Sequence, residues 1–440
     1  MSNQMSKMFP SISNRAVSRR AFLGGAAALG AAGAFGSLVG TSSRANAATT
    51  LQFQTSAGAR FGTPNAALIS KFNALNSDLQ VVMDTVPVQN YFPKLSTEVA
   101  SNASNLQVFT GITNLLYAFA ATGKIVPFDE VFTPQQIADI EADIPKKYLD
   151  TWRFKGRLYA IPNDSNAQWS FYRKDLFDAA GVGLPAKWED AEAIAKKLTK
   201  GGVYGYTASL RRGEYAGAHF SSILFSYGGE YWDAGFNPTI DSEAGLKAVE
   251  VMRALMPYAD PGSVNAGEDD TAQVIASGVA AWAPLEWGRS DLTDASKIAS
   301  AANIETAVPP DGGDHPAAPC LGGQAYMIAN WAPDKAAAAK WVSYATSAEV
   351  MRTFVANQGQ PARASALNDP ENVKIGRYFP TLQKVLAQGH PFPAIPESYQ
   401  FLVEVGNHVA DILTGTVTPK QGLKDANAAF ATQLKDAGYL

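Results

Sequence analysis

The sequence predicts an α/β fold built as two lobes. From Leu51 onward, short apolar segments alternate with segments of helical periodicity, and small or polar residues separate them. At 440 residues the chain exceeds the usual size of one hydrophobic core. Its composition, 46% hydrophobic and 17% charged, provides the apolar side chains that a large folded protein needs. Two α/β lobes are therefore the expected architecture.

The first elements follow from this alternation. In chain order we expect strand 51–55, helix 64–75, strand 80–86, helix 91–100, strand 106–109 and helix 115–121. Gly123 is suited to end the last of these helices. Open parallel sheets bind ligands at the carboxyl ends of their strands. The loops at 56–62 and 110–114 are therefore the first candidates for ligand contact.

The first 47 residues differ from the rest, because they hold five basic residues and no acidic one. The segment S-R-R-A-F-L at 18–23 matches the twin-arginine export pattern and precedes an Ala/Gly-rich stretch. Ala45 and Ala47 provide the small residues that a signal peptidase requires. We expect a signal peptide at 1–47, cleaved before Ala48, and a periplasmic protein. An uncleaved anchor is less favoured, since six glycines up to Gly40 weaken its hydrophobicity.

Charge and residue types argue against several functions. Removing five positive charges from a chain of net charge −4 leaves −9, and no basic run remains to bind nucleic acid. Four histidines without metal-ligand spacing indicate no metal site. Nucleotide-binding and nucleophile-elbow motifs do not occur, so we expect no cofactor and no enzyme activity. Cys320 lies in a Pro/Gly loop and is expected to pack.

Seven motifs follow one another along the chain. They are G-R-L-Y-A-I-P at 156–162, W-S-F-Y-R-K-D-L-F at 169–177, A-G at 180–181 with P-A-K-W-E-D at 185–190, Y-G-G-E-Y-W-D at 227–233, G-V-A-A-W at 278–282, G-G-Q-A-Y-M-I at 322–328 and G-Q-P-A-R-A-S at 359–365. In this order and spacing they resemble family 1 solute-binding proteins, the maltose-binding-like receptors of ABC importers. One departure is Ser104-Asn105, where that family often has Pro-Asp.

The resemblance implies a two-lobed periplasmic-binding-protein fold of type II, with a ligand cleft between lobes that close around the solute. It places one lobe at 48–160 and 323–362 and the other at 161–322 and 363–440. The hinge crossings are expected near 159–162, 322–328 and 361–365. The implied partners are a carbohydrate, the permease subunits of the inner membrane and, during export, the twin-arginine translocase. We expect a monomer.

A sugar presents hydroxyls and apolar faces, so its site needs aromatic rings together with amides, carboxylates and arginines. The resemblance assigns ligand binding to Arg60, Phe61, Asn114, Asp164, Asn166, His219, Trp232, Trp282, Glu286, Trp287, Gly323 and Arg363. Several have a competing structural role: core packing for Trp232, Trp282 and His219, turn formation for Asp164 and Asn166, and a salt bridge for Arg363. The segment 213–220 is expected to be a loop that shapes or covers the cleft.

Two alternatives stay open at this stage. The same fold could bind a non-sugar or anionic solute, such as a glycerophosphodiester, a sulfosugar or a polyol. An anion would be bound through Arg60, Arg289 or Arg363. The less favoured alternative is an exported enzyme, because twin-arginine export often carries proteins folded around cofactors.

Overall fold

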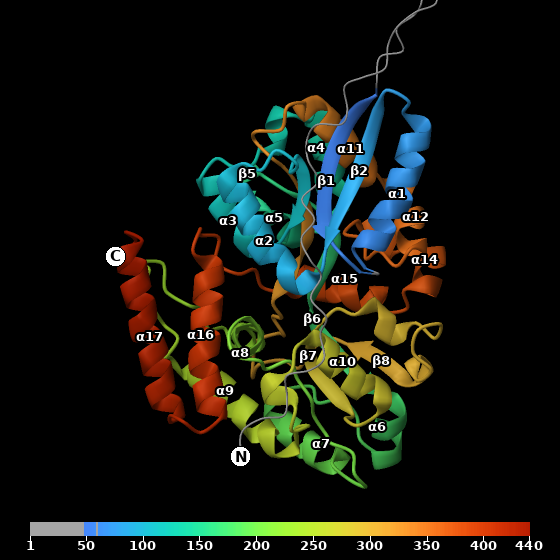
Figure 1. Cartoon of the computed structure of the whole chain (residues 1–440). Coiled ribbons are helices and arrows are strands. Elements are labelled where there is room, and N and C mark those ends of the chain that lie inside the picture. The colour runs from blue at the N-terminus through green and yellow to red at the C-terminus, as the bar shows by residue number, and fades with distance from the viewer. Residues whose placement is uncertain (1–47, 59) are drawn as a thin grey trace, which may run out of the picture. The chain divides into compact units, whose positions relative to one another are not determined.

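The computed structural model describes residues 48–58 and 60–440 (Figure 1). The predicted signal peptide at 1–47, with its cleavage point, lies outside the described residues.

The strands are few and most are short. They are β1 Thr49–Ser56, β2 Leu79–Val86, β3 Val108–Gly111, β4 Arg153–Phe154, β5 Arg157–Leu158, β6 Ile161–Arg173, β7 Trp282–Trp287, β8 Ile304–Ala307 and β9 Leu321–Ile328. The helices are α1 Gly62–Leu75, α2 Val88–Ser101, α3 Thr113–Ala121, α4 Pro134–Asp143, α5 Lys146–Asp150, α6 Lys174–Ala180, α7 Ala191–Leu198, α8 Glu214–Ser226, α9 Glu243–Leu255, α10 Glu268–Ser277, α11 Lys335–Ala345, α12 Met351–Ala356, α13 Ala364–Leu367, α14 Pro370–Ile375, α15 Phe379–Gln388, α16 Ser398–Leu413 and α17 Pro419–Asp436.

All six elements predicted for the first part of the chain are present as β1 to β3 and α1 to α3. The third strand begins two residues later than expected, because Leu106 forms a turn with Ala103 and is buried before the strand begins. Gly123 follows α3 with a φ of +66°, as its predicted capping role requires. The segment 213–220 is not a loop: all but Gly213 belongs to helix α8.

One sheet runs through the molecule in the order β2-β1-β3-β9-β6-β7, and β8 pairs with β6. Strands β1, β2 and β3 are parallel, whereas β9 is antiparallel to both β3 and β6. The 13-residue β6 pairs through its first half with β9 and through its second half with β7 and β8. In Figure 1, β6 accordingly lies between β1 and β2 at one end and β7 and β8 at the other. This strand connects the two halves of the sheet.

The three predicted crossing segments lie together at this strand. Ile161 pairs with Tyr326 of β9, and the pairing continues to Ala167 and Leu321. The Ser165 backbone N–H donates to the Gln360 carbonyl at 3.0 Å, and its hydroxyl donates to the Pro361 carbonyl at 2.7 Å. Segments about 160 and 200 positions apart in the sequence thus meet at one place, as hinge strands would.

Buried side chains form two separate cores. The first takes most of its residues from 51–171 and 321–386, and Phe53, Tyr326 and Trp341 pack there ring against ring. The second takes its residues from 177–287, Cys320 and 392–434. Each fully buried large side chain contributes about 1.5–3 kcal/mol to folding. These cores support two packing units, while the lobe limits at 160/161, 322/323 and 362/363 remain a prediction.

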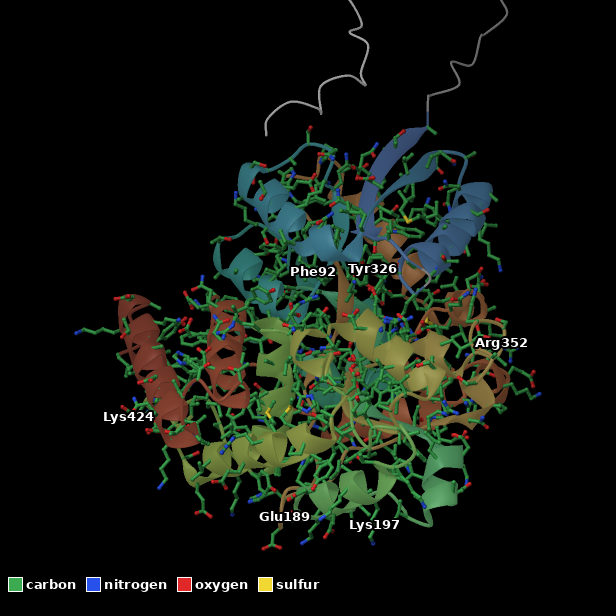
Figure 2. All side chains as sticks on the ribbon, turned by 60° about the horizontal axis from the view of Figure 1, so that its bottom comes forward. Phe92, Glu189, Lys197, Tyr326, Arg352 and Lys424 are labelled. Atoms are coloured by element: carbon green, nitrogen blue, oxygen red, sulfur yellow. The ribbon has the colours of Figure 1, made fainter. Side chains whose placement is uncertain are left out.

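Charged side chains cover the outside. Glu189, Lys197 and Lys424 are exposed, whereas Tyr326 lies inside the first core (Figure 2). Within 48–58 and 60–440, no helix combines the length and the apolar character that crossing a membrane would require.

Candidate functional site

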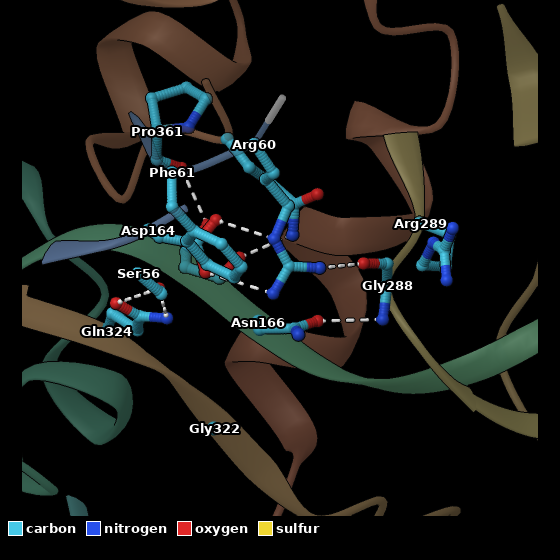
Figure 3. A network of polar contacts seen from close by, with 12 residues as sticks. Ser56, Arg60, Phe61, Asp164, Asn166, Gly288, Arg289, Gly322, Gln324 and Pro361 are labelled. Atoms are coloured by element: carbon cyan, nitrogen blue, oxygen red, sulfur yellow. Dashed lines mark hydrogen bonds and ion pairs between the residues drawn. The ribbon is translucent and has the colours of Figure 1, made fainter. Parts of the chain in front are cut away.

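A polar group lies where the loop after β1 meets β6 and the end of β7 (Figure 3). Arg60 of that loop reaches Asp164 on β6: its Nε lies 3.1 Å from Oδ1, and its Nη2 donates to Oδ2 at 3.2 Å. Its Nη1 donates to the carbonyl of Gly288, just beyond β7. The Phe61 ring centroid is 4.6 Å from the guanidinium carbon. One side chain from the first loop therefore contacts strand β6 and the residue that follows strand β7.

Asp164 is the buried acid of this group, with its side chain fully shielded from solvent. Burial raises the pKa of Asp164 to about 7, although the Arg60 guanidinium opposes this and the charge of Glu268 adds to it. The shift favours the protonated form of this carboxyl group over that of an exposed aspartate, and the contact with Arg60 favours the ionised form. The ionised form only accepts hydrogen bonds, and the protonated form can also donate one.

Asn166 ties β6 to the end of β7. Its side-chain oxygen accepts hydrogen bonds from the backbone N–H of Gly288 at 2.8 Å and of Ala167 at 2.9 Å (Figure 3). A Cβ on Gly288 would lie 1.8 Å from the Trp169 ring, so only glycine allows this approach. Asp164 and Asn166, two positions apart on β6, are therefore both linked to Gly288. Asn166 accepts from its N–H, and Arg60, which contacts Asp164, donates to its carbonyl.

A second polar cluster lies at the carboxyl ends of β1 and β3. Gln324 of β9 donates from Nε2 to the Ser56 hydroxyl at 2.7 Å and accepts from the Thr110 hydroxyl at 2.7 Å. Sequence reasoning chose Gly323 instead. Gly323 has a φ of +113°, and a Cβ there would lie 2.1 Å from the Asp164 carbonyl oxygen. Its role in the structure is to let β9 approach β6 closely.

A third polar cluster is formed by Glu286 and its neighbours. Glu286 is 1% exposed and accepts hydrogen bonds from the Ser209 hydroxyl at 2.7 Å and from the Trp287 N–H at 3.1 Å. Burial, reinforced by the nearby charge of Glu268, raises the pKa of Glu286 to about 8. Burial raises the pKa of Glu268 as well, against the charges of Arg60 and Arg289. The site is thus rich in carboxyl groups that resist ionisation.

The start of α8 brings residues that sequence reasoning missed. Glu214 accepts a hydrogen bond from the Tyr399 hydroxyl of α16 at 3.0 Å, and the Arg211 guanidinium lies 4.6 Å from the Tyr215 ring centroid. Burial raises the pKa of Glu214 first, and the charge of Glu268 contributes. These residues therefore belong to the same electrostatic environment as Glu286. The local signal was Gly213, whose φ of +90° precedes the helix.

The three arginines that would bind an anionic solute are already paired with acidic side chains. Arg289 contacts Asp291 at 2.8 Å and Asp269 at 2.7 Å. Arg363 contacts Asp143 at 3.0 Å and donates to the Thr346 carbonyl at 2.6 Å, in the first core. With Arg60 held by Asp164, each of the three carries a carboxylate partner.

Three predicted ligand residues pack in or against the second core, which also contains Trp287. Trp282 is fully buried and stacks on Trp188, with ring centroids 6.5 Å apart and an interplanar angle of 29°. His219 is fully buried, its Nε2 lies 3.0 Å from the Tyr206 hydroxyl, and burial lowers its pKa to about 3. Trp232 is half-buried and packs edge-on against Phe401, with ring centroids 5.0 Å apart. The structure does not bring these three rings to Asp164.

The other predicted residues differ in how near they lie to the polar group. Trp287 packs over Gly322, where a Cβ would lie 2.6 Å from its ring, and it follows Glu286 directly. Asn114 lies in the first turn of α3, is 4% exposed and follows β3, at the edge of the sheet that holds Thr110. Arg363 has the first-core partners given above and stays outside the polar group.

Within the described part of the chain, no three His, Cys, Asp or Glu side chains are placed to hold a metal ion. Cys320 is buried in the second core, and burial raises the pKa of its thiol to about 12.

The fold is that of a solute-binding protein. The model of the bacterial extracellular solute-binding protein family matches residues 67–376, and the chain belongs to this family. A probable amino-acid ABC transporter periplasmic-binding protein of Sinorhizobium fredii is 26% identical over 79% of this chain and 81% of its own. The mannitol-binding protein of Pseudomonas aeruginosa is 25% identical over 79% of this chain and 84% of its own.

Solved structures share the fold. A solute-binding protein of Agrobacterium vitis with bound D-mannitol has a TM-score of 0.77 at 22% identity, and covers 89% of this chain and 99% of its own. A maltose-bound protein of T. maritima has a TM-score of 0.78 at 20% identity, and covers 88% of this chain and all of its own. Both support the two-lobed architecture expected from the sequence.

Proposed function

We propose that this protein captures a neutral, polyhydroxylated solute, a sugar or an alditol, and delivers it to the permease of an ABC importer. Two relatives point to this solute class: the mannitol-binding protein by its sequence and the D-mannitol complex by its fold. The polar group around Asp164 would form the binding site. Export through the twin-arginine route, cleavage before Ala48, a periplasmic location and a monomeric state belong to the same proposal.

The observation that carries the proposal is the balance of charge. Arg60, Arg289 and Arg363 already have carboxylate partners, so none has a free charge for an anion. Glu268 and Glu286, in contrast, have raised pKa values and no ion pair among the described residues. In its protonated form such a carboxyl group can both donate a hydrogen bond to a hydroxyl and accept one from it without adding a charge. A solute with many hydroxyls and no charge fits this environment best.

The expected mechanism is closure of two lobes around the solute. The loop at 56–62 and the ends of β1, β3 and β9 belong to one lobe as predicted from the sequence. Glu286 and the start of α8 belong to the other. A solute that pairs with both sides stabilises the closed form, because only differential contacts shift such an equilibrium. The solute is bound and released unchanged.

A ligand screen tests the proposal. D-Mannitol, ribitol, maltose, D-gluconate and an L-amino acid mixture are added to the purified protein, and the melting temperature is measured. At about 100 times the dissociation constant, a ligand stabilises the folded state by about 2.7 kcal/mol. We expect such a shift with a neutral polyhydroxy compound, confirmed by calorimetry with recovery of the intact compound. Binding of only gluconate, only amino acids, or a compound that is converted would refute it.

A further inference from the structure

The ion pair between Arg60 and Asp164 is more than a contact between two side chains. Arg60 is 14% exposed and Asp164 is fully shielded, so the pair lies in a region of low dielectric. Both carboxylate oxygens face the guanidinium, which also donates to the Gly288 carbonyl (Figure 3). The Arg60 side chain therefore joins three segments: the loop at 56–62, strand β6 and the end of β7.

Arg60 is also the cation that acts on Asp164. The other charged or titratable groups around this carboxyl group are Glu268 from α10, Tyr148 from α5 and Tyr378 before α15. Glu268 disfavours the ionised form of Asp164 by like-charge repulsion, and burial does so by desolvation. Tyr148 donates to the Asp164 carbonyl at 3.3 Å and does not neutralise the carboxylate. The ionised form of Asp164 thus depends on Arg60.

The guanidinium is committed to the protein. Nη2 donates to Asp164 and Nη1 to Gly288, Nε lies 3.1 Å from the other Asp164 oxygen without a hydrogen bond, and the Phe61 ring lies beside the guanidinium at 4.6 Å. A group fixed in this way has little freedom to turn toward a solute. Its contribution to binding is better exerted through the residues it holds.

We propose that Arg60 is a positioning residue: through its contact with Asp164 it keeps that side chain as a hydrogen-bond acceptor for the solute, and its contact with the Gly288 carbonyl holds the guanidinium in place when the lobes are closed. This inference rests on the function proposed above for the site as a whole. It differs from direct recognition of an anion by Arg60.

The test compares Arg60→Met and Arg60→Lys with a matched control, Arg173→Met. Arg173 has a similar exposure, 11%, and a similar two-point contact with Asp175, at 2.9 and 2.7 Å, but it lies at the far end of β6. The first readout needs no solute. The Asp164 carboxyl carbon is titrated by NMR in protein labelled with ¹³C aspartate, and its signal is assigned by its loss in Asp164→Asn.

Without ligand, we expect Arg60→Met to move the Asp164 titration upward by at least about one pH unit, since the favourable cation is gone. Arg60→Lys should reverse part of this shift. Arg173→Met should leave the Asp164 titration as it is in the wild type. An Asp164 titration that is the same in Arg60→Met and in the wild-type protein overturns the proposal. This readout does not depend on which solute binds, so it stands even if the proposed solute class is wrong.

The second readout is the affinity for D-mannitol between about pH 5 and pH 9. In the wild type, affinity should rise with pH as Asp164 ionises. In Arg60→Met it should fall about 30-fold at pH 7.5, as expected when a buried charged partner is removed, and its midpoint should move upward with the titration. Arg173→Met should stay within about twofold of the wild type. If Arg60→Met abolishes binding of D-gluconate and leaves mannitol binding unchanged, Arg60 binds anions directly and the proposal is refuted.

Discussion

Strand β7 has two ends that differ in character although both carry a tryptophan. At its start, Trp282 pairs across the sheet with Tyr172 and stacks on Trp188 inside the second core. At its end, Glu286 and Trp287 pair with Trp169 and Gln168, a few residues from Asp164 and Asn166. Both tryptophans belong to the second core, but the end that carries Trp287 also carries the polar contacts of Glu286. The neighbours on β6, and not the residue type, decide which role a side chain has.

The largest expected effect lies at the packed end. Trp282→Ala should lower the free energy of unfolding by about 3–5 kcal/mol, because it removes a fully buried ring from a close-packed core. Chemical denaturation measures this loss. At temperatures where the variant is folded, its affinity for solute should stay within about threefold of the wild type. A larger loss of affinity with unchanged stability would place Trp282 in the site.

The polar end should respond in the opposite way. Trp287→Ala should weaken solute binding by about 10- to 100-fold, because an aromatic face beside Glu286 is lost. Calorimetry with the solute found in the screen measures this change. Trp341→Ala is the matched control, since Trp341 is fully buried in the first core and contacts Phe53 and Tyr326. Equal affinity losses in both variants would mean that Trp287 affects binding only as a packing residue.

Glu286 gives the polar end a dependence on pH. Its carboxyl group ionises near pH 4.3 in the unfolded chain and near pH 8 in the folded protein. The stability that this group contributes is complete below about pH 4 and is lost as the pH rises through about 8. Glu286→Gln abolishes this titration, so the stability of the variant relative to the wild type should rise by about 4 kcal/mol as the pH goes from 5 to 8. Thermal unfolding across this range measures the gain, and a constant difference between the two proteins would contradict it.

The smallest expected effect concerns Ser209, whose hydroxyl donates to Glu286 at 2.7 Å. Ser209→Ala should cost about 0.5–1.5 kcal/mol of stability at pH 9, where Glu286 is ionised and uses this hydrogen bond most. It should also raise the pKa of Glu286 further, since the hydroxyl stabilises the ionised form. Stability curves at pH 6 and pH 9 test both statements. A loss that is larger at pH 6 would mean that Ser209 serves the protonated form.

The sequence was informative where the signal is local. Apolar alternation predicted all six of the first elements, and motif order placed Asp164 and Asn166 at the crossing, where the structure brings Asp164 to Arg60 and Asn166 to Gly288. The missed residues depend on distant contacts. Tyr399 meets Glu214 across 185 positions, and Gln324 meets Ser56 across 268. No periodicity connects such pairs, so composition could mark Gly213 as a break in the chain but could not show what Glu214 faces.

For tryptophan and histidine the sequence predicted ligand contacts at residues that pack inside the protein. Trp282 and His219 carry groups that suit a ligand, and only their surroundings reveal that they pack against Trp188 and Tyr206. Burial of an aromatic residue looks the same in a sequence whether its neighbour is a solute or another ring.

Strand β9 determines when this protein can complete its fold during synthesis. It lies between β3 and β6, yet the ribosome makes it more than 200 residues after β3. Until residues 321–328 emerge, β3 and β6 each have an unpaired edge, and such edges pair readily with other chains. The nascent protein therefore carries an unpaired strand edge while about half of its residues are made, and chaperones have that period in which to bind it. A product that terminates before β9 would keep both edges open and would be a target for proteolysis.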